Sequence, residues 1–473
     1  MSDAQIVAAL RARLEQLSAE DAFSGAVLLS KNGRVLFEKA YGYANHAFKA
    51  ANRVDTKFNL GSLGKMFTGV AILQLAQQGK LSLDDTVLKL VPDYPVKQIA
   101  GKITVRELLT HTSGLGSFFN EKFFDTNMGR FDTIESHLPL FTGKPLLFEP
   151  GTQWSYSNAG FIVLGLVIER VSGESYYDYV REHVFKPAGM SNTDNYEPDQ
   201  DVANLAVGYV EIQPEPKPGE SRRLNFPGAL PFGGPRKTNA TVVPRGSSAG
   251  GGYSTVEDLM HFAEALQGHK LLDTEHTDLD MTGHVATTHE NAKYAFGMIE
   301  EFVNGVRIVG HSGGAPGINS NLDMYPDAGY VVAVMSNYDG AATLINARIR
   351  AWLTGQKLPQ AIALPAAALQ AFEGTYTATP PSDSAPGAAG QPGAGGGNGA
   401  PVSARLEVRS DASGLWLVSG GRHRLFPLSP TEFFDDNAPE LRFSFTRDAD
   451  GRITSLTLPG RTAGARITAK KAS

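Results

Sequence analysis

Residues 61–79 read GSLGKMFTGVAILQLAQQG. This stretch has the apolar periodicity of a helix and stops at a glycine, so we predict a helix from about Ser62 to Gln78 that ends at Gly79. Its buried face is expected to carry Met66, Val70, Leu73 and Leu75. Because Ser62 and Lys65 are three residues apart, they would share one face of that helix near its N-terminal end.

The pairing of Ser62 with Lys65 suggests nucleophilic chemistry. A lysine one turn from a serine hydroxyl can act as its base if burial or a neighbouring cation lowers the pKa of the lysine. The helix N-terminus offers unpaired N–H groups, which would stabilise an oxyanion formed beside Ser62. The alternative is that Ser62 only caps the helix and that Lys65 is a solvated lysine, because this spacing is common by chance.

A second motif is Tyr156-Ser157-Asn158, which follows a turn. Tyr156 and Asn158 occupy alternate positions, so their side chains could face the same way. A phenol beside a lysine ammonium ionises more readily and can shuttle protons, and an amide both donates and accepts hydrogen bonds. Taken alone, the segment is more readily a core tyrosine and a capping asparagine.

The third motif is His311-Ser312-Gly313-Gly314, which follows a strand expected to end at Val309. Its small residues would let a substrate backbone lie along the strand edge, and the Gly314 N–H would be a second oxyanion donor. A lone histidine at a strand end is more often structural, so the role of His311 depends on the other two motifs.

The remaining pattern indicates an α+β fold with an antiparallel sheet. A hairpin is predicted within 25–43 around Asn32-Gly33, and capping boxes begin helices at Thr104 and Ser254. Between the hairpin and the later strands lies a block of helices. The later strands and a last helix are expected at 306–309, 320–325, 330–336 and 341–353. The terminal segments of this region could share one sheet.

The composition changes after Gln360, which divides the chain into residues 1–360 and 361–473. Residues 378–401 are rich in Gly, Pro, Ala and Ser and are predicted to be a flexible insert. The segment 372–376 before the insert and five short runs after it predict a small all-β domain. This domain would be a structural cap or oligomerisation module, with exposed strand edges favouring an interaction role, or its loops would close over the pocket.

Composition excludes several classes of function. The 473 residues include no cysteine, which removes disulfides and thiol chemistry, and the net charge of −6 argues against a nucleic-acid partner. No run is long and apolar enough to span a bilayer. The N-terminus, 1–17, is expected to be an amphipathic helix and does not have the pattern of a signal peptide. We therefore expect either a cytoplasmic protein or one whose leader has been removed from this sequence.

Other polar clusters are assigned no chemistry. The histidines 276, 284 and 289 lack the spacing of metal ligands on one face, so no metal site is predicted. His111 is expected to hold its own turn by local hydrogen bonds, and Asp435-Asp436 to be a solvated face. The glycine-rich string 246–252 lacks a phosphate-loop pattern and is expected to allow close backbone packing near the pocket.

The three motifs in this order resemble those of the serine β-lactamase and penicillin-binding-protein superfamily. With Tyr-Ser-Asn second and a histidine first in the third motif, the chain looks like the branch of class C β-lactamases, D,D-carboxypeptidases, D-aminopeptidases and family VIII esterases. The strings 108–115, 148–158 and 250–259 also resemble that branch. The likeness covers roughly 22–353, and the C-terminal part resembles the lipocalin-like barrel domain appended to some of these hydrolases.

This resemblance implies a set of roles. Ser62 would be the nucleophile, and Lys65 and Tyr156 would share the base and acid roles. The N–H groups of Ser62 and Gly314 would form the oxyanion hole. Substrate would be held by Asn158, His311, Ser312 and Gly313, with Gly314 beside them. No cofactor or metal is implied, and the partner would be a small ester, amide or short peptide, with a homo-oligomer possible.

Two departures from the pattern affect the expected substrate. His311 stands where most true β-lactamases have a lysine that binds the drug carboxylate, and no glutamate clearly serves a deacylating water, since Glu149 sits in a turn. We therefore expect a carboxylesterase, or a peptidase of D-amino-acid or cell-wall type. The alternatives are a β-lactamase or penicillin-binding sensor that acylates but deacylates slowly, and a non-catalytic assembly protein.

Overall fold

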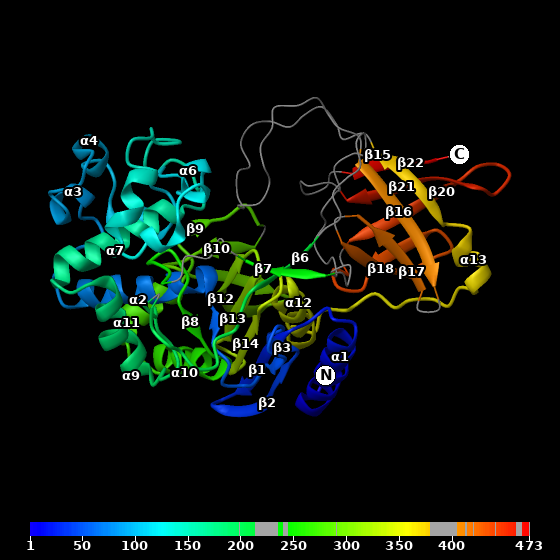
Figure 1. Ribbon diagram of the computed structural model, residues 1–473, viewed down its shortest axis with the longest axis horizontal. Helices are drawn as coiled ribbons and strands as arrows, with labels where there is room; N and C mark the ends of the chain where they lie inside the picture. The colour runs from blue at the N-terminus through cyan, green and yellow to red at the C-terminus, as the bar shows by residue number, and fades with distance from the viewer. Residues whose placement is uncertain are drawn as a thin grey trace. The chain divides into compact units, whose positions relative to one another are not determined.

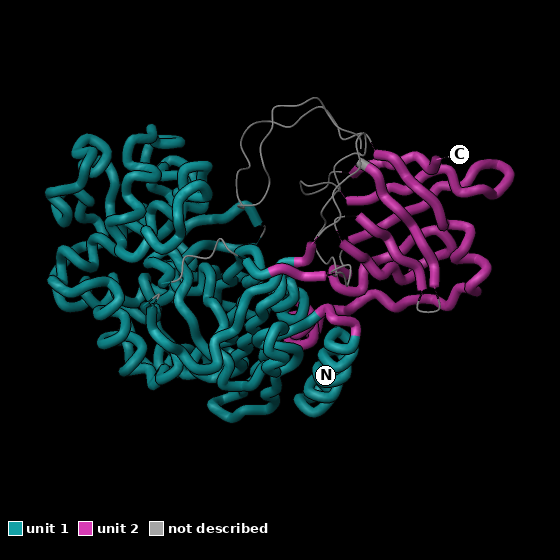
Figure 2. Tube along the Cα trace, viewed as in Figure 1, with its two compact units in different colours: residues 1–19, 23–210, 238–346 teal, residues 20–22, 211–237, 347–473 magenta. Residues whose placement is uncertain are grey.

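The computed structural model describes ten stretches of the chain. They are 1–197, 199–212, 235–239, 245–289, 291–378, 404–411, 414–419, 421–439, 441–459 and 466–472. Figure 2 shows two compact units, of which the first comprises 1–19, 23–210 and 238–346, and the second 20–22, 211–237 and 347–473. The glycine- and proline-rich insert predicted at 378–401 lies outside the described residues except for Ala378.

The first unit is built on an eight-stranded antiparallel sheet (Figure 1). Strand β1 pairs with β14 from Gly25 opposite Ser336 to Lys31 opposite Tyr330, which confirms that early and late segments share one sheet. In spatial order the strands are β2 (Arg34–Tyr41), β1 (Gly25–Lys31), β14 (Tyr330–Ser336), β13 (Ile318–Tyr325), β12 (Val306–Ala315), β11 (Ile299–Val303), β10 (Ala292–Tyr294) and β9 (Val285–Ala286).

The predicted hairpin is β1–β2. Its two turn residues, Asn32 and Gly33, have positive φ angles of 48° and 75°, as the tightest hairpin turns require. Three short strand pairs lie outside the main sheet: β3 (Tyr43–Asn45) with β4 (Ala50–Ala51), β5 (Phe58–Asn59) with β8 (Tyr253–Ser254), and β6 (Tyr209–Glu211) with β7 (Arg236–Thr238).

Helices lie on both sides of the sheet, with α1 packed on β2 and α10 packed on β1 and β14 (Figure 1). The α-helices up to the last sheet strand are α1 (Asp3–Ala19), α2 (Gly64–Gln77), α3 (Val87–Leu90), α4 (Lys97–Ala100), α5 (Val105–Leu109), α6 (Glu121–Phe124), α7 (Asn158–Ser172), α8 (Tyr176–Val180), α9 (Lys186–Ala188), α10 (Val256–Gln267) and α11 (Thr274–Met281). Shorter turns of 3-10 or π type are η1 (Gly61–Leu63), η2 (Met128–Arg130), η3 (Glu135–Leu140) and η4 (Arg181–Phe185). Helix α12 (Ala341–Leu353) follows β14.

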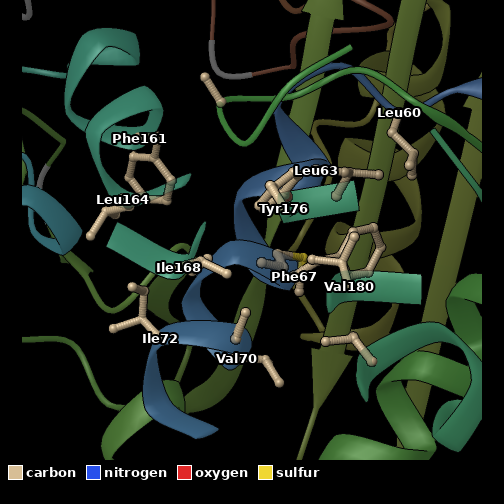
Figure 3. Close-up of a cluster of buried hydrophobic side chains, with 14 of the residues drawn as sticks. Leu60, Leu63, Phe67, Val70, Ile72, Phe161, Leu164, Ile168, Tyr176 and Val180 are labelled. Carbon is tan, nitrogen blue, oxygen red and sulfur yellow. The ribbon is translucent and has the colours of Figure 1, made fainter. Parts of the chain in front are cut away.

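Helix α2 is buried on all sides, whereas the sequence predicted only one buried face. Of its first ten residues, Gly64–Leu73, all are buried. The reason is its position, because α2 packs against α7, α8 and α11 and against the η4 turn. Figure 3 shows this packing, in which side chains of the η1–α2 segment lie among Phe161, Leu164 and Ile168 of α7 and Tyr176 and Val180 of α8.

The predicted capping box at Thr104 is confirmed, because its side chain accepts from the N–H of Glu107 and the Glu107 carboxylate accepts in return. The box predicted at Ser254 does not form, and helix α10 is capped one residue later. The cap is Thr255, which accepts from the N–H of Asp258. Ser254 is instead buried and shares a hydrogen bond of 2.7 Å with Thr193.

The sequence missed β9, β10 and β11 and ended β12 too early. Adjacent glutamates break the alternation of β11, and the extension of β12 consists mostly of small residues with weak strand preference. Pairing with β13 nevertheless continues to Ala315 opposite Ile318. His311 to Gly314 therefore lie within a strand and do not follow one.

The second unit contains a closed barrel, which confirms the barrel domain implied by the resemblance, whereas the prediction of exposed strand edges was wrong. Helix α13 (Ala366–Gln370) precedes it. Its strands are β15 (Gly374–Ala378), β16 (Ala404–Asp411), β17 (Gly414–Val418), β18 (Arg422–Pro427), β19 (Glu432–Asp435), β20 (Arg442–Arg447), β21 (Ile453–Pro459) and β22 (Arg466–Lys471). Apolar side chains such as Phe372, Leu417 and Phe443 form its core. The sequence missed β19 and β22.

Asp435, predicted to be solvated, is fully buried in the second unit. Its carboxylate contacts Nδ1 of the buried His423 at 2.6 Å and accepts from the N–H of Asn437. A buried carboxylate needs such partners, and the strand β19 that carries it gave no sequence signal. Among the described helices of the whole chain, none has the length and apolarity needed to cross a membrane.

Candidate active site

The first motif folds as a 3-10 turn that runs directly into a helix. Ser62 is the middle residue of η1, and α2 begins two residues later. Within the described residues no side chain caps η1 or α2, so the Ser62 hydroxyl is not used as a helix cap. Ser62 is half-buried, whereas Lys65 has no exposed surface. Both structural alternatives, a capping serine and a solvated lysine, are therefore excluded.

The Lys65 amine lies among three oxygen atoms. Its Nζ is 3.3 Å from Ser62 Oγ and 2.8 Å from Asn158 Oδ1, and it donates to the carbonyl oxygen of Ala249. The ring of Tyr156 lies below it, with the centroid 4.9 Å from Nζ. Burial lowers the pKa of Lys65 well below that of an ordinary lysine.

These contacts suit a neutral amine. The Asn158 and Ala249 oxygens can only accept, so each takes one N–H. The amine then retains a lone pair, and Ser62 Oγ is the neighbouring group whose proton that lone pair can accept. Complete burial favours the neutral form because the charged form would lose its hydration.

The second motif reaches Lys65 through the start of α7. Ser157 caps that helix by accepting from the N–H of Gly160 at 2.9 Å, and its hydroxyl donates to the Gly116 carbonyl at 2.8 Å. Asn158 is therefore the first helical residue, and its amide and the Tyr156 ring both contact Lys65. The side chains of Tyr156 and Asn158 therefore face the same group, as the sequence predicted.

The Tyr156 hydroxyl is buried and, among the described residues, has no hydrogen-bond partner of ordinary geometry. Burial raises the pKa of Tyr156, and the nearby Ser62 hydroxyl partly opposes that rise. The resting phenol is therefore neutral and lies close to the serine–lysine pair.

The third motif lies against the η1 turn. Pairing of β11 with β12 ends at Gly310, so β11 does not cover the strand edge from His311 to Ala315. Ser312 and Gly314 are exposed, whereas His311 and Gly313 are buried. A Cβ atom built on Gly61 would lie 3.0 Å from the Gly314 nitrogen, and one built on Gly313 would lie 2.9 Å from the Ser62 nitrogen. The two backbone segments are thus in direct contact.

Replacing Gly313 by alanine is expected to destabilise the protein by about 1–3 kcal/mol, because the new methyl group would overpack a backbone contact. That methyl would lie 2.0 Å from the Leu60 carbonyl oxygen, so η1 and β12 would have to separate. Thermal denaturation measures the effect. The control is Gly314→Ala, whose methyl would lie 4.0 Å from the nearest side-chain atom and should leave the melting temperature unchanged. Equal melting temperatures for both variants would contradict the expectation.

His311 has both ring nitrogens engaged. Its Nδ1 lies 2.5 Å from the Ser312 carbonyl, which can only accept, so Nδ1 carries the proton. Its Nε2 therefore accepts from the Tyr294 hydroxyl at 3.2 Å. Burial lowers the pKa of His311 to about 3, so the ring is neutral near pH 7.

Sequence reasoning missed three members of this site. The Ala249 carbonyl comes from the string 246–252, whose glycines allow the close approach: a Cβ on Gly250 would lie 2.5 Å from the Gly61 carbonyl oxygen. Tyr294 comes from β10, which was not predicted. His111 does not hold only its own turn, because its ring contacts Tyr156 with 4.3 Å between centroids. A backbone carbonyl and ring packing leave no motif in a sequence.

Glu149 lies outside the site. Its carboxylate is exposed and pairs with the Lys102 ammonium at 3.1 Å. In the part of the chain that the structure describes, no group of three or more histidine and carboxylate side chains is placed to hold a metal ion.

A buried lysine between a half-exposed serine, a tyrosine and an asparagine, on an antiparallel sheet with flanking helices, defines a class of protein. The model of the Beta-lactamase family matches residues 10–356, and the chain belongs to that family. The superfamily to which this family belongs comprises serine hydrolases, among them penicillin-binding proteins.

Individual relatives agree with this assignment. The chain is 29% identical over 336 residues to penicillin-binding protein 4* of Bacillus subtilis, covering 69% of this chain and 71% of the relative. It spans only 59% of the length of Protein flp of Staphylococcus aureus. The solved penicillin-binding protein from Bacillus halodurans is 32% identical, with a TM-score of 0.63 over 72% of this chain and 98% of that one. EstCE1, described as a hydrolase with promiscuous acyltransferase activity, is 26% identical, with a TM-score of 0.60 over 75% and 99%.

Proposed function

We propose that this protein is a serine hydrolase that forms a covalent acyl-enzyme from small esters or amides. The observation that carries the proposal is the fully buried Lys65 amine, 3.3 Å from the half-exposed Ser62 hydroxyl. A buried amine with a lowered pKa is a base within reach of the serine proton, which is what activation of a serine nucleophile requires.

In the acylation step, Ser62 Oγ would attack the substrate carbonyl carbon while its proton moves to the neutral Lys65 amine. The C–O bond to serine forms, and the carbonyl oxygen takes the negative charge. Collapse of this intermediate expels the alcohol or amine, which takes a proton from Lys65 or through the Tyr156 hydroxyl. The N–H groups of Ser62 and Gly314 are our proposed oxyanion hole, supported by the contact between η1 and β12.

In deacylation, a water would attack the acyl carbon and give its proton to the same Lys65–Tyr156 pair. The acyl C–O bond to Ser62 then breaks, the departing Oγ takes that proton back, and the carboxylic acid leaves. Glu149 is paired with Lys102 at the surface, so we assign it no part in this step. Asn158 would hold Lys65 through its Oδ1 and offer its NH₂ to substrate, and the exposed Ser312 would line the strand edge where substrate lies.

The proposed substrates carry no carboxylate beside the reacting bond. His311 is neutral and both its nitrogens are engaged by Ser312 and Tyr294, so it offers neither a charge nor a free donor to such a group. We therefore favour neutral esters, then D-amino-acid or cell-wall-type amides, over β-lactams. Residues 1–360 would form this hydrolase, and we assign no catalytic group to residues 361–473.

The test is turnover of p-nitrophenyl butyrate, D-alanyl-p-nitroanilide and nitrocefin, with an intact-mass search for an acyl adduct on Ser62. We expect turnover of the butyrate, with kcat/KM at least tenfold above that for nitrocefin. Efficient nitrocefin turnover without ester turnover would overturn the substrate proposal. No turnover and no adduct with any of the three would count against the hydrolase itself.

A second candidate function is a penicillin-binding sensor that acylates but deacylates slowly. It is favoured by the surface position of Glu149, which leaves deacylation to the groups that also acylate. A stable β-lactam adduct on Ser62, without ester turnover, would decide for the sensor.

A further inference from the structure

One buried histidine of the site has no part in the proposed reaction. His111 follows α5, has no exposed surface, and has a φ angle of 59°. This left-handed conformation is uncommon for a residue other than glycine. Such a conformation persists only where surrounding contacts hold it.

His111 binds both chain neighbours of Tyr156. Its main-chain carbonyl accepts from the N–H of Ser155 at 3.0 Å, and its ring Nδ1 accepts from the N–H of Ser157 at 3.0 Å. Tyr156 is therefore held between two hydrogen bonds to one residue. Because a backbone N–H can only donate, Nδ1 has no proton and the neutral ring carries its proton on Nε2.

The same ring packs against the aromatic side chains of the site. Its centroid is 4.3 Å from that of Tyr156 and 4.3 Å from that of Tyr294. Tyr294 in turn donates to His311. Burial lowers the pKa of His111 well below its ordinary value, which keeps Nδ1 available as an acceptor.

His111 is connected to Lys65 through Ser157 and Asn158. The Ser157 N–H held by His111 belongs to the residue that caps α7, and the next residue is Asn158, whose Oδ1 accepts from Lys65. Losing the Nδ1 acceptor would leave a buried N–H without a partner and allow the 155–158 segment to move. Displacements of about 1 Å can lower a rate about 100-fold.

We propose that His111 is a positioning residue, and that its unprotonated Nδ1 fixes the Tyr156-Ser157-Asn158 segment against Lys65. The expected effect on catalysis rests on the proposed function, whereas the contacts of His111 do not depend on it.

A matched pair of amides tests the proposal. In His111→Asn, Oδ1 stands the same number of bonds from the backbone as Nδ1, and asparagine tolerates the left-handed conformation. In His111→Gln, the acceptor is one bond too far out. We expect the asparagine variant to keep kcat within about tenfold of wild type, and the glutamine variant to fall about 100-fold with KM changed by less than about threefold. Equal kcat values for the two variants would overturn the proposal.

Two readouts do not depend on activity. The ¹⁵N-histidine spectrum of the wild-type protein should contain the signal of a neutral imidazole with Nδ1 unprotonated, and this signal should be missing from the spectrum of His111→Asn. Amide exchange at Ser155 should stay slow in both variants, whereas at Ser157 it should speed up only in His111→Gln. A charged ring, or an Nδ1–H tautomer at pH 7, would overturn the proposal even in an active enzyme. If only the proposed function fails, the wild-type protein will show no serine-dependent turnover, but its histidine spectrum and amide exchange will be as expected. The Ser62→Ala variant should give the same histidine spectrum and amide exchange as wild type.

Discussion

Replacing Ser62 by alanine is expected to lower kcat for any ester or amide that the protein turns over by about 10⁴-fold or more. The change removes the oxygen that would form the bond to the acyl carbon and leaves the rest of the site in place. A loss of 10⁴-fold corresponds to about 5.5 kcal/mol of transition-state stabilisation. Steady-state turnover of p-nitrophenyl butyrate measures it, and intact mass should show no acyl adduct.

The alanine variant should fold as the wild type does, because Ser62 is half-buried and its hydroxyl caps neither η1 nor α2. The matched control is Ser82→Ala, an exposed serine in the loop after α2, which should retain full activity. Turnover that survives in the Ser62 variant would rule out an acyl-enzyme on this residue. An adduct found on another side chain would reassign the nucleophile.

Replacing Lys65 by methionine is expected to lower kcat by about 10³-fold, near the middle of the 10²–10⁴ range for loss of a general base. Methionine has a similar length and no proton acceptor, so Ser62 would keep its place and lose its base. Lys65→Arg should be as damaging, because a guanidinium stays protonated in proteins. Retention of kcat by the arginine variant would contradict a base role for Lys65.

The same base sets an expectation for the pH profile. In the proposed mechanism the active form of Lys65 is the neutral amine, so kcat/KM for a non-ionising ester should rise with pH through the Lys65 pKa and then level off. Because burial lowers that pKa well below that of an ordinary lysine, the rise should end below the range in which exposed lysines titrate. The Lys65→Met variant should lack this rise of kcat/KM with pH. A rise of the wild-type kcat/KM at the pH where exposed lysines titrate would show that the Lys65 amine is hydrated.

Much of the fold could be predicted because its signals are local. The Asn32-Gly33 turn, the capping box at Thr104 and the helix that follows Ser62 each depend on a few neighbouring residues. The short strands β9 to β11 could not, because adjacent glutamates in β11 hide the alternation and pairing with β12 supplies the stability that the sequence lacks.

The candidate site divides in the same way. The sequence by itself determined which chemistry is available, because Ser62 with Lys65, Tyr156 with Asn158, and His311 with its small neighbours are three local motifs in a recognisable order. Only the tertiary structure decided the state of these groups. Burial of Lys65 between α7 and the 246–252 loop favours its neutral form, burial of His311 keeps that ring neutral, and the Ala249 carbonyl and His111 ring enter from segments distant in the chain. The physical reason is that hydration, and with it the pKa of a side chain, depends on everything packed around it, whereas a motif specifies only its own residues.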